Sequence, residues 1–176
     1  MSRLTPPPSA HDHAHGPADA PVTLAEYGDY ECPYCGAAYP VVKALQRRFG
    51  HRLRFIFRNF PLTQVHPHAE HAAEAAEAAA DAGKFWEMHD AIFEHQDAMA
   101  DRDLAGYAAQ AGIDPAAITG ALAAHTYAPR VRADFMSGVR SGVNGTPTFF
   151  INGQKYDGEY DAGSLGEAIE GAMAAD

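Results

Sequence analysis

The chain has few basic residues, only two cysteines and no long apolar stretch. Against 23 Asp and Glu residues it has 13 Lys and Arg residues, so its formal net charge is −10 at pH 7. This excess of negative charge argues against nucleic acid and anionic membranes as the main partners. Because no stretch is long and apolar enough to cross a bilayer, we also expect no membrane insertion.

The first 20 residues lack the apolar core of a signal peptide, so nothing in them directs export. Their Pro, Ser, Ala and Asp residues give little to pack, and we expect residues 1–20 to form a flexible tail. His11, His13 and His15 alternate in this segment, where adventitious metal binding competes with the simpler interpretation of a solvated tail. Since no signal peptide is seen, we expect a cytoplasmic protein.

The two cysteines, Cys32 and Cys35, are separated by two residues. Residues 22–27, before the pair, are rich in strand-forming residues and contain no Gly or Pro. Residues 37–49, after the pair, carry apolar residues at helical spacing, and Pro33 suits the first position of that helix. The sequence therefore predicts that the dithiol lies where a strand ends and a helix begins.

Two kinds of interpretation compete for this dithiol. A helix N-terminus favours a thiolate over a thiol, and the thiolate is the form that attacks disulfides. The other interpretations are half of a zinc site and an inert structural pair. A zinc site needs four ligands, and the chain has no second Cys-x-x-Cys pair to supply them. Redox chemistry is therefore the favoured interpretation.

Three acidic residues lie close to the dithiol. Glu26 shares a strand face with Val22 and Leu24, and a carboxylate on an apolar face needs a partner or a task. It is either a buried acid that moves protons to and from the dithiol or a strand-end residue that reaches solvent. Asp29 and Glu31 are expected to be exposed, where their negative charge would oppose thiolate formation.

The middle of the chain is predicted to be helical. Residues 51–58 predict a strand, and residues 66–142 then show helical patterns throughout. Asp114 followed by Pro115 indicates a capped helix start within them. A helical block of roughly 75 residues is too long for a simple crossover between strands. The 176 residues, 47% of them hydrophobic, therefore suit one globular domain with a helical insertion.

Three histidines, His66, His68 and His71, lie at the start of this block. His68 and His71 would share a helix face, so a metal site is one interpretation. No carboxylate or cysteine pattern completes such a site, and capping or surface roles are favoured.

The last third of the chain predicts a hairpin and a final helix. Asn152-Gly153 stands between two strand-like runs and is a strong hairpin signal. Pro147 opens the first run, and an ordinary trans bond is the default there because only about 5–6% of such bonds are cis. Residues 164–174 predict a short helix.

These features follow one another in a recognisable order: a strand, Cys-Pro-Tyr-Cys, a helix containing Pro40, a long helical block, and Gly-Thr-Pro-Thr-Phe-Phe-Ile-Asn-Gly. From about residue 21 to the C-terminus the chain resembles the DsbA-like branch of the thioredoxin superfamily. The resemblance implies an α/β thioredoxin fold, a central mixed sheet flanked by helices, with an inserted all-helical domain. The implied division is a flexible tail at 1–20, a thioredoxin-like domain at 21–62 and 141–176, and the helical insertion at 63–140.

The resemblance also implies roles for individual residues. Cys32 is expected to be the exposed nucleophile and Cys35 the resolving cysteine. Glu26 falls where the family keeps a buried acid, which favours the proton-transfer role. The Thr146-Pro147 bond is expected to be cis and packed beside the dithiol. The expected substrate-binding residues are Pro33, Tyr34, Thr146 and Pro147, and no metal or cofactor is expected.

The implied function is a thiol–disulfide oxidoreductase that acts on protein disulfides by mixed-disulfide exchange. The Pro-Tyr pair departs from the Pro-His of strongly oxidising DsbA proteins and resembles that of glutaredoxins. The expected reduction potential is therefore near the glutaredoxin range of about −200 to −230 mV. Whether the enzyme acts as a reductase, an isomerase or an oxidase stays open. Protein thiols and disulfides are the expected substrates, with glutathione or a thioredoxin-type reductant as electron partner.

Two other functions remain as alternatives. One is a glutathione-dependent transferase or isomerase on the same fold, against which the retention of Cys35 counts. The other is a metal-binding module that uses Cys32, Cys35 and nearby His residues.

Overall fold

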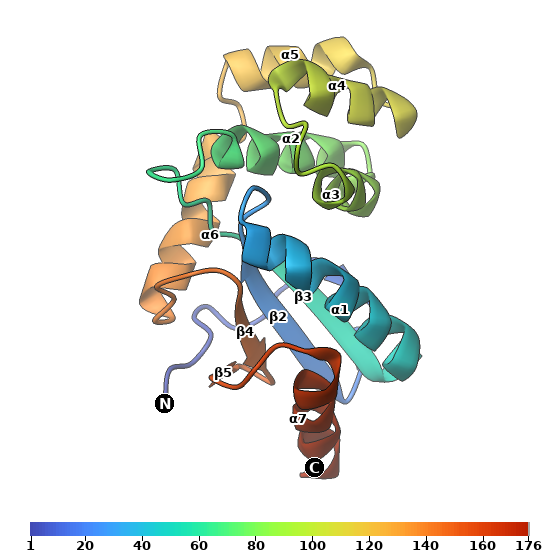
Figure 1. Ribbon diagram of the computed structural model, residues 1–176, viewed down its shortest axis with the longest axis vertical. Helices are drawn as coiled ribbons and strands as arrows, with labels where there is room; N and C mark the ends of the chain where they lie inside the picture. The colour runs from blue at the N-terminus through green and yellow to red at the C-terminus, as the bar shows by residue number, and fades with distance from the viewer. Residues whose placement is uncertain (176) are drawn as a thin grey trace. The chain divides into compact units, whose positions relative to one another are not determined.

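The computed structural model describes residues 1–175, which fold into two compact units. The first unit comprises Met1–Gly28, Ala37–Arg58 and the chain from Met136 onward. The second comprises Asp29–Gly36 and Asn59–Phe135. Helix α1 (Pro33–Phe49) begins in the second unit and continues into the first (Figure 1).

The first unit is built on a mixed sheet whose five strands, within the described residues, have the order β1-β3-β2-β4-β5. β1 is antiparallel to β3, β2 to β4, and β4 to β5. The sheet with its helices confirms the predicted α/β class. The strands are β1 (His13–His15), β2 (Val22–Gly28), β3 (Leu53–Asn59), β4 (Thr148–Ile151) and β5 (Gln154–Tyr156).

The core of this unit lies around β2, in which every residue except Thr23 is buried. Helix α7 (Ala162–Ala174) packs against β2 and β4. Its start is fixed by Asp161, whose side chain accepts hydrogen bonds from two backbone N–H groups of the first turn. A short 3-10 turn, η1 (Gly50–Arg52), connects α1 to β3.

The hairpin between β4 and β5 turns at the predicted dipeptide. Asn152 and Gly153 have φ angles of 47° and 78°, in the left-handed region. Both central residues of a type I′ turn need this region, and Asn and Gly adopt it more readily than other residues. The hairpin prediction is therefore confirmed.

The N-terminal segment, expected to be a flexible tail, packs on the first unit. Leu4 is buried, and β1 pairs with β3 through His13 and Phe57. The Arg58 guanidinium holds this segment through a buried ion pair with Asp12, at 2.8 Å from Nε to Oδ1. The ion pair joins residues 46 positions apart, so the local composition does not reveal it.

The second unit is helical apart from the end of β3 and the turns. Its helices are α2 (Ala69–Asp81), α3 (Phe85–Glu94), α4 (Asp101–Gln110), α5 (Pro115–Ala123) and the first part of α6 (Ala128–Arg140). Helix α2 is central and contacts α3, α4 and α5. Its buried side is formed mainly by alanines, which allow neighbouring helices to approach closely: Ala69, Ala72, Ala73, Ala75, Ala76 and Ala79.

The predicted start of α5 is confirmed. The Asp114 side chain accepts a hydrogen bond from Ala116 N at 3.0 Å, and Pro115 occupies the first helical position. Asp103 has a comparable role at the start of α4, where its carboxylate accepts from Ala100 N at 3.0 Å. Among the residues that the structure describes, no helix is long and apolar enough to cross a membrane.

Candidate dithiol site

The dithiol lies at the turn that leads into α1. Cys32 immediately precedes the helix, and its backbone N–H donates to the carbonyl oxygen of Asp29 at 3.1 Å. Cys35 lies in the first helical turn, which contains no acidic residue. The partial positive charge of the helix N-terminus favours the thiolate form of a cysteine at this position.

Both cysteines are buried, Cys32 with 3% of its surface exposed and Cys35 with none. The resemblance implied an exposed Cys32, so the structure differs on this point. Hydrogen bonds fold the turn back onto Asp29 and draw Cys32 inward. The accessible part of the motif is instead Pro33 and Tyr34, the latter with 66% of its surface exposed.

Asp29 organises this turn. One carboxylate oxygen accepts hydrogen bonds from Glu31 N at 2.8 Å and Cys32 N at 3.2 Å. The other accepts from Leu62 N and from His66 Nδ1, both at 2.8 Å. Asp29 is 1% exposed, so the expectation of an exposed side chain is wrong. Four donors at hydrogen-bond distance explain how a carboxylate is accommodated there.

His66 brings a titratable base to the dithiol turn. Burial lowers the pKa of His66, but the hydrogen bond and charge of Asp29 raise it, and negative charge at Cys32 and Glu31 raises it further. The net direction is above the ordinary value of 6.5. Its side chain is 19% exposed. The carboxylate of Asp29 therefore favours the protonated form of His66, and a negative charge at Cys32 favours it further.

Gln96, which lies in the segment after α3, contacts the dithiol turn. Its Nε2 donates to the carbonyl oxygens of Tyr30 and Cys32, at 2.9 and 3.0 Å. A Cβ atom at Gly36 would lie 2.0 Å from Gln96 Oε1, so the close approach of Gln96 to α1 requires glycine there.

A buried aromatic group supports the same turn. The hydroxyl of Tyr30 lies 2.9 Å from His89 Nδ1, and both residues are buried. The ring of Phe93 lies 4.8 Å from that of Tyr30, centroid to centroid. Tyr30, two residues before Cys32, is therefore fixed by packing as well as by hydrogen bonds.

Three of the predicted site residues belong to the first unit. Glu26 lies on β2 opposite Phe149 and is 3% exposed, so it is a buried acid and not a strand-end residue that reaches solvent. The Thr146-Pro147 bond is cis, as the resemblance implied. It directly precedes β4, whose Thr148 pairs with Tyr27 near the C-terminal end of β2.

The sequence did not point to His66 or Gln96 as part of the site. His66 was assigned a capping or surface role, and Gln96 carried no signal. Their contacts join residues 37 and 64 positions apart, so no local pattern links them to the dithiol.

The three histidines at the start of the helical block, His66, His68 and His71, do not form one group in the structure. His66 binds Asp29, whereas His71 lies beside Glu74 and His125. His68 contributes its backbone N–H, which donates to Glu31 Oε2 at 2.7 Å. A carboxylate therefore does lie beside His71, together with a histidine from a distant segment.

Known proteins with similar sequences place this chain in a family. The family model described as Thioredoxin matches residues 9–171. The Na(+)/H(+) antiporter NhaA 1 of Salinispora arenicola is 46% identical over 171 residues, which are 97% of this chain and 26% of that protein. The chain thus spans about a quarter of the length of the curated relatives that it matches.

Solved structures agree with this family match. BdbD from Bacillus subtilis, in its oxidised form, superposes with a TM-score of 0.86 at 26% identity, over 99% of this chain and 100% of that chain. A thioredoxin-like oxidoreductase from Silicibacter pomeroyi DSS-3 gives 0.81 at 26% identity, over 96% and 95%. Alpha-DsbA1 of Wolbachia pipientis, at 19% identity, shares the fold with a TM-score of 0.83 over 99% and 97%.

The relatives correct one expectation from the sequence. The lack of a signal peptide suggested a cytoplasmic protein, but the relatives that contain this stretch are named as Na(+)/H(+) antiporters. The match covers only about a quarter of those longer proteins, and the cytoplasmic assignment is therefore withdrawn.

The predicted fold is confirmed by the family match and the solved structures together. The described geometry places the Cys-Pro-Tyr-Cys dithiol at a helix N-terminus, as the residue pattern on either side of it predicted. The chain belongs to the thioredoxin family.

Proposed function

We propose that this chain exchanges disulfides with protein substrates through Cys32 and Cys35. The observation that carries the proposal is the position of Cys32 at the start of α1, with its N–H bound to Asp29 and His66 bound to the same carboxylate. A helix N-terminus and a nearby cation both favour the thiolate that the reaction needs.

The proposed reaction transfers two electrons in two exchange steps. In the reducing direction the Cys32 thiolate attacks one sulfur of a substrate disulfide. A mixed disulfide forms, and the other substrate sulfur leaves as a thiolate that takes up a proton. Cys35 then attacks the Cys32 sulfur, which forms the Cys32–Cys35 disulfide and releases the second substrate sulfur as a thiolate. Oxidation of a substrate dithiol follows the same steps in reverse.

His66 supplies a positive charge that the Pro-Tyr pair lacks. A cation near Cys32 stabilises the reduced, thiolate form and so raises the reduction potential. Asp29 holds the imidazole through the 2.8 Å hydrogen bond to Nδ1 and raises its pKa. We therefore propose a potential above that of thioredoxin, at about −270 mV, and below that of DsbA, at about −120 mV.

Cys35 and the substrate chain need further partners. We propose that Glu26, a buried acid, handles the proton of Cys35 directly or through water. We also propose that a substrate strand pairs with the backbone at Thr146, and that Pro33 and Tyr34, which are exposed, contact the substrate. The burial of Glu26 supports the first of these roles.

The test is insulin reduction with dithiothreitol as electron donor. Wild-type protein should accelerate the reduction, and Cys32→Ser should lose the activity while far-UV circular dichroism shows an unchanged fold. A wild-type protein without activity that contains about one zinc ion bound by both thiols would overturn the proposal. That result would support the metal-binding alternative.

A further inference from the structure

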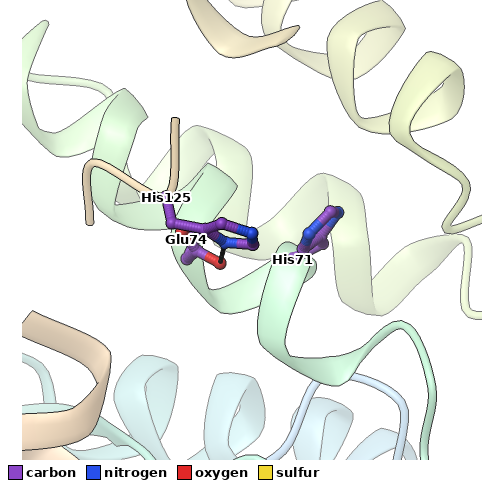
Figure 2. Close-up of side chains that lie close together, drawn as sticks. All are labelled: His71, Glu74 and His125. Carbon is purple, nitrogen blue, oxygen red and sulfur yellow. Dashed lines mark hydrogen bonds and ion pairs between the residues drawn. The ribbon is translucent and has the colours of Figure 1, made fainter. Parts of the chain in front are cut away.

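A second cluster of functional side chains lies in the helical unit. His71 and Glu74 are three residues apart on α2, and His125 lies in the connection between α5 and α6. One ligand-type atom from each of the three residues lies within 4.8 Å of the other two. Figure 2 shows the three side chains close together, with His125 joined to Glu74.

Glu74 is the least expected member of this cluster, because its side chain is fully buried. Its Oε2 lies 3.4 Å from His125 Nδ1, at the long end of hydrogen-bond distances. Its Oε1 is buried and has no hydrogen-bond partner among the described residues. Burial raises the pKa of Glu74, while His125 and His71 act in the opposite direction. A buried carboxylate is costly unless it is paired, hydrogen-bonded or bound to a metal ion. Glu74 has one long contact to His125 and one oxygen without a hydrogen bond, so a bound cation would stabilise it.

We propose that His71, Glu74 and His125 bind a divalent transition-metal ion, with Zn²⁺ as the ion that best fits two imidazoles and one carboxylate. Three protein ligands with a water in the fourth position are a common zinc arrangement. Mg²⁺ and Ca²⁺ prefer sets of oxygen ligands, which this cluster does not offer.

The cluster needs only a small closure to form the site. Atoms bound to one Zn²⁺ at about 2.0–2.2 Å lie roughly 3.4 Å apart in a tetrahedral arrangement. The observed limit of 4.8 Å is close to that separation. The His125 side chain is 60% exposed and so has room to move toward Glu74.

Two neighbouring contacts help to position the proposed ligands His71 and His125. Asp101 Oδ1 lies 2.7 Å from Nδ1 of His71. A carboxylate in this position commonly orients a metal-bound histidine and fixes its tautomer. The hydroxyl of Tyr127, two residues after His125, donates to Asp81 at the end of α2. This contact ties the connection that carries His125 to the helix that carries the other two ligands.

His125 itself has a φ of 49°, in the left-handed region that few non-glycine residues adopt. Histidine and asparagine are among the side chains that tolerate it. The substitution His125→Asn therefore removes the imidazole while it keeps the backbone conformation accessible.

The test is a zinc titration of the full chain against a chromophoric chelator. Cys32→Ser/Cys35→Ser serves as the reference protein, because it removes the thiols that would otherwise bind zinc. We expect about one Zn²⁺ per chain and an affinity that falls about tenfold or more in His125→Asn and in Glu74→Gln. His51→Asn, which changes an exposed histidine elsewhere, is the matched control and should bind as the reference does.

Thermal unfolding gives an independent result. Zn²⁺ should raise the unfolding midpoint of the reference protein and of His51→Asn, but not that of His125→Asn. Since His125 is exposed, that variant should fold, which circular dichroism would verify. The proposal is overturned if the reference protein binds no stoichiometric zinc. It is equally overturned if His125→Asn retains the reference affinity, as it would if His11, His13 and His15 held the ion.

Discussion

The Nδ1 atom of His66 lies 2.8 Å from Oδ2 of Asp29, whose other oxygen accepts the backbone N–H of Cys32. One carboxylate thus connects a histidine to the turn that carries the dithiol. The raised pKa of His66 means that its positive charge persists above the pH at which an ordinary histidine becomes neutral. This relationship supplies the electrostatic argument for Cys32 as a thiolate.

Replacement of His66 by Gln should make Cys32 harder to ionise. The variant loses a positive charge near the sulfur, so the thiolate titration should move to higher pH by about one unit. The ultraviolet absorbance of the thiolate, followed against pH in a Cys35→Ser background, measures this shift. His68→Gln is the matched control, because the His68 side chain is exposed and only its backbone N–H contacts Glu31. If the thiolate titration shifted equally in both variants, His66 would have no specific effect on Cys32.

The stability of the protein should depend on pH through His66. Its folded-state pKa lies above the ordinary 6.5, so the protonated imidazole stabilises the folded state. This contribution is fully present below pH 6.5 and is lost as the pH rises through the folded-state pKa. Urea unfolding of wild type and His66→Gln, from about pH 5 to about pH 9, should give a difference that shrinks with rising pH. If the difference in unfolding free energy between the two proteins grew with rising pH, the pKa of His66 would not be raised by folding.

Gly36 and Gln96 should be energetically coupled. In the wild-type background Gly36→Ala introduces a Cβ 2.0 Å from Gln96 Oε1 and should disturb the two hydrogen bonds that Gln96 donates. In a Gln96→Ala background the clash is absent, and the same change should stabilise the helix by about 0.5–1 kcal/mol. Urea unfolding of the four proteins forms a double-mutant cycle. Additive effects would show that the two residues do not interact.

The reduction potential should lie between those of thioredoxin and DsbA, near the glutaredoxin range of about −200 to −230 mV. The Pro-Tyr pair lacks the histidine of strongly oxidising DsbA proteins, and His66 compensates for part of that loss. A titration against reduced and oxidised glutathione measures the potential. His66→Gln should give a more negative value than wild type, since it destabilises the reduced form. A wild-type value near −120 mV would contradict this account.

Features with a local cause could be predicted from the sequence. The strand before Cys32 and the helix after it follow from residue type and spacing. The hairpin at Asn152-Gly153 follows from backbone freedom, and the start of α5 follows from Asp114 and Pro115. The fold class then followed from the order of these features along the chain.

Features made by distant contacts could not be predicted in the same way. Asp29 was expected to be exposed because its neighbours in the sequence do not indicate that four donors surround it. Two of those donors come from residues 33 and 37 positions away. The N-terminal segment was expected to be flexible because its ion pair with Arg58 lies 46 positions away. In each case a polar residue is buried with a partner that only the tertiary structure supplies.

The most direct test of the central claim is a trapping experiment with reduced Cys35→Ser protein and insulin, without added reductant. The account predicts a stable mixed disulfide between insulin and Cys32, mapped by mass spectrometry, and no turnover. The Cys32→Ser protein, treated in the same way, should form little adduct because Cys35 is fully buried. If Cys35→Ser instead reduced insulin at the wild-type rate with dithiothreitol present, or if no adduct formed on Cys32, the two-cysteine exchange mechanism would be wrong.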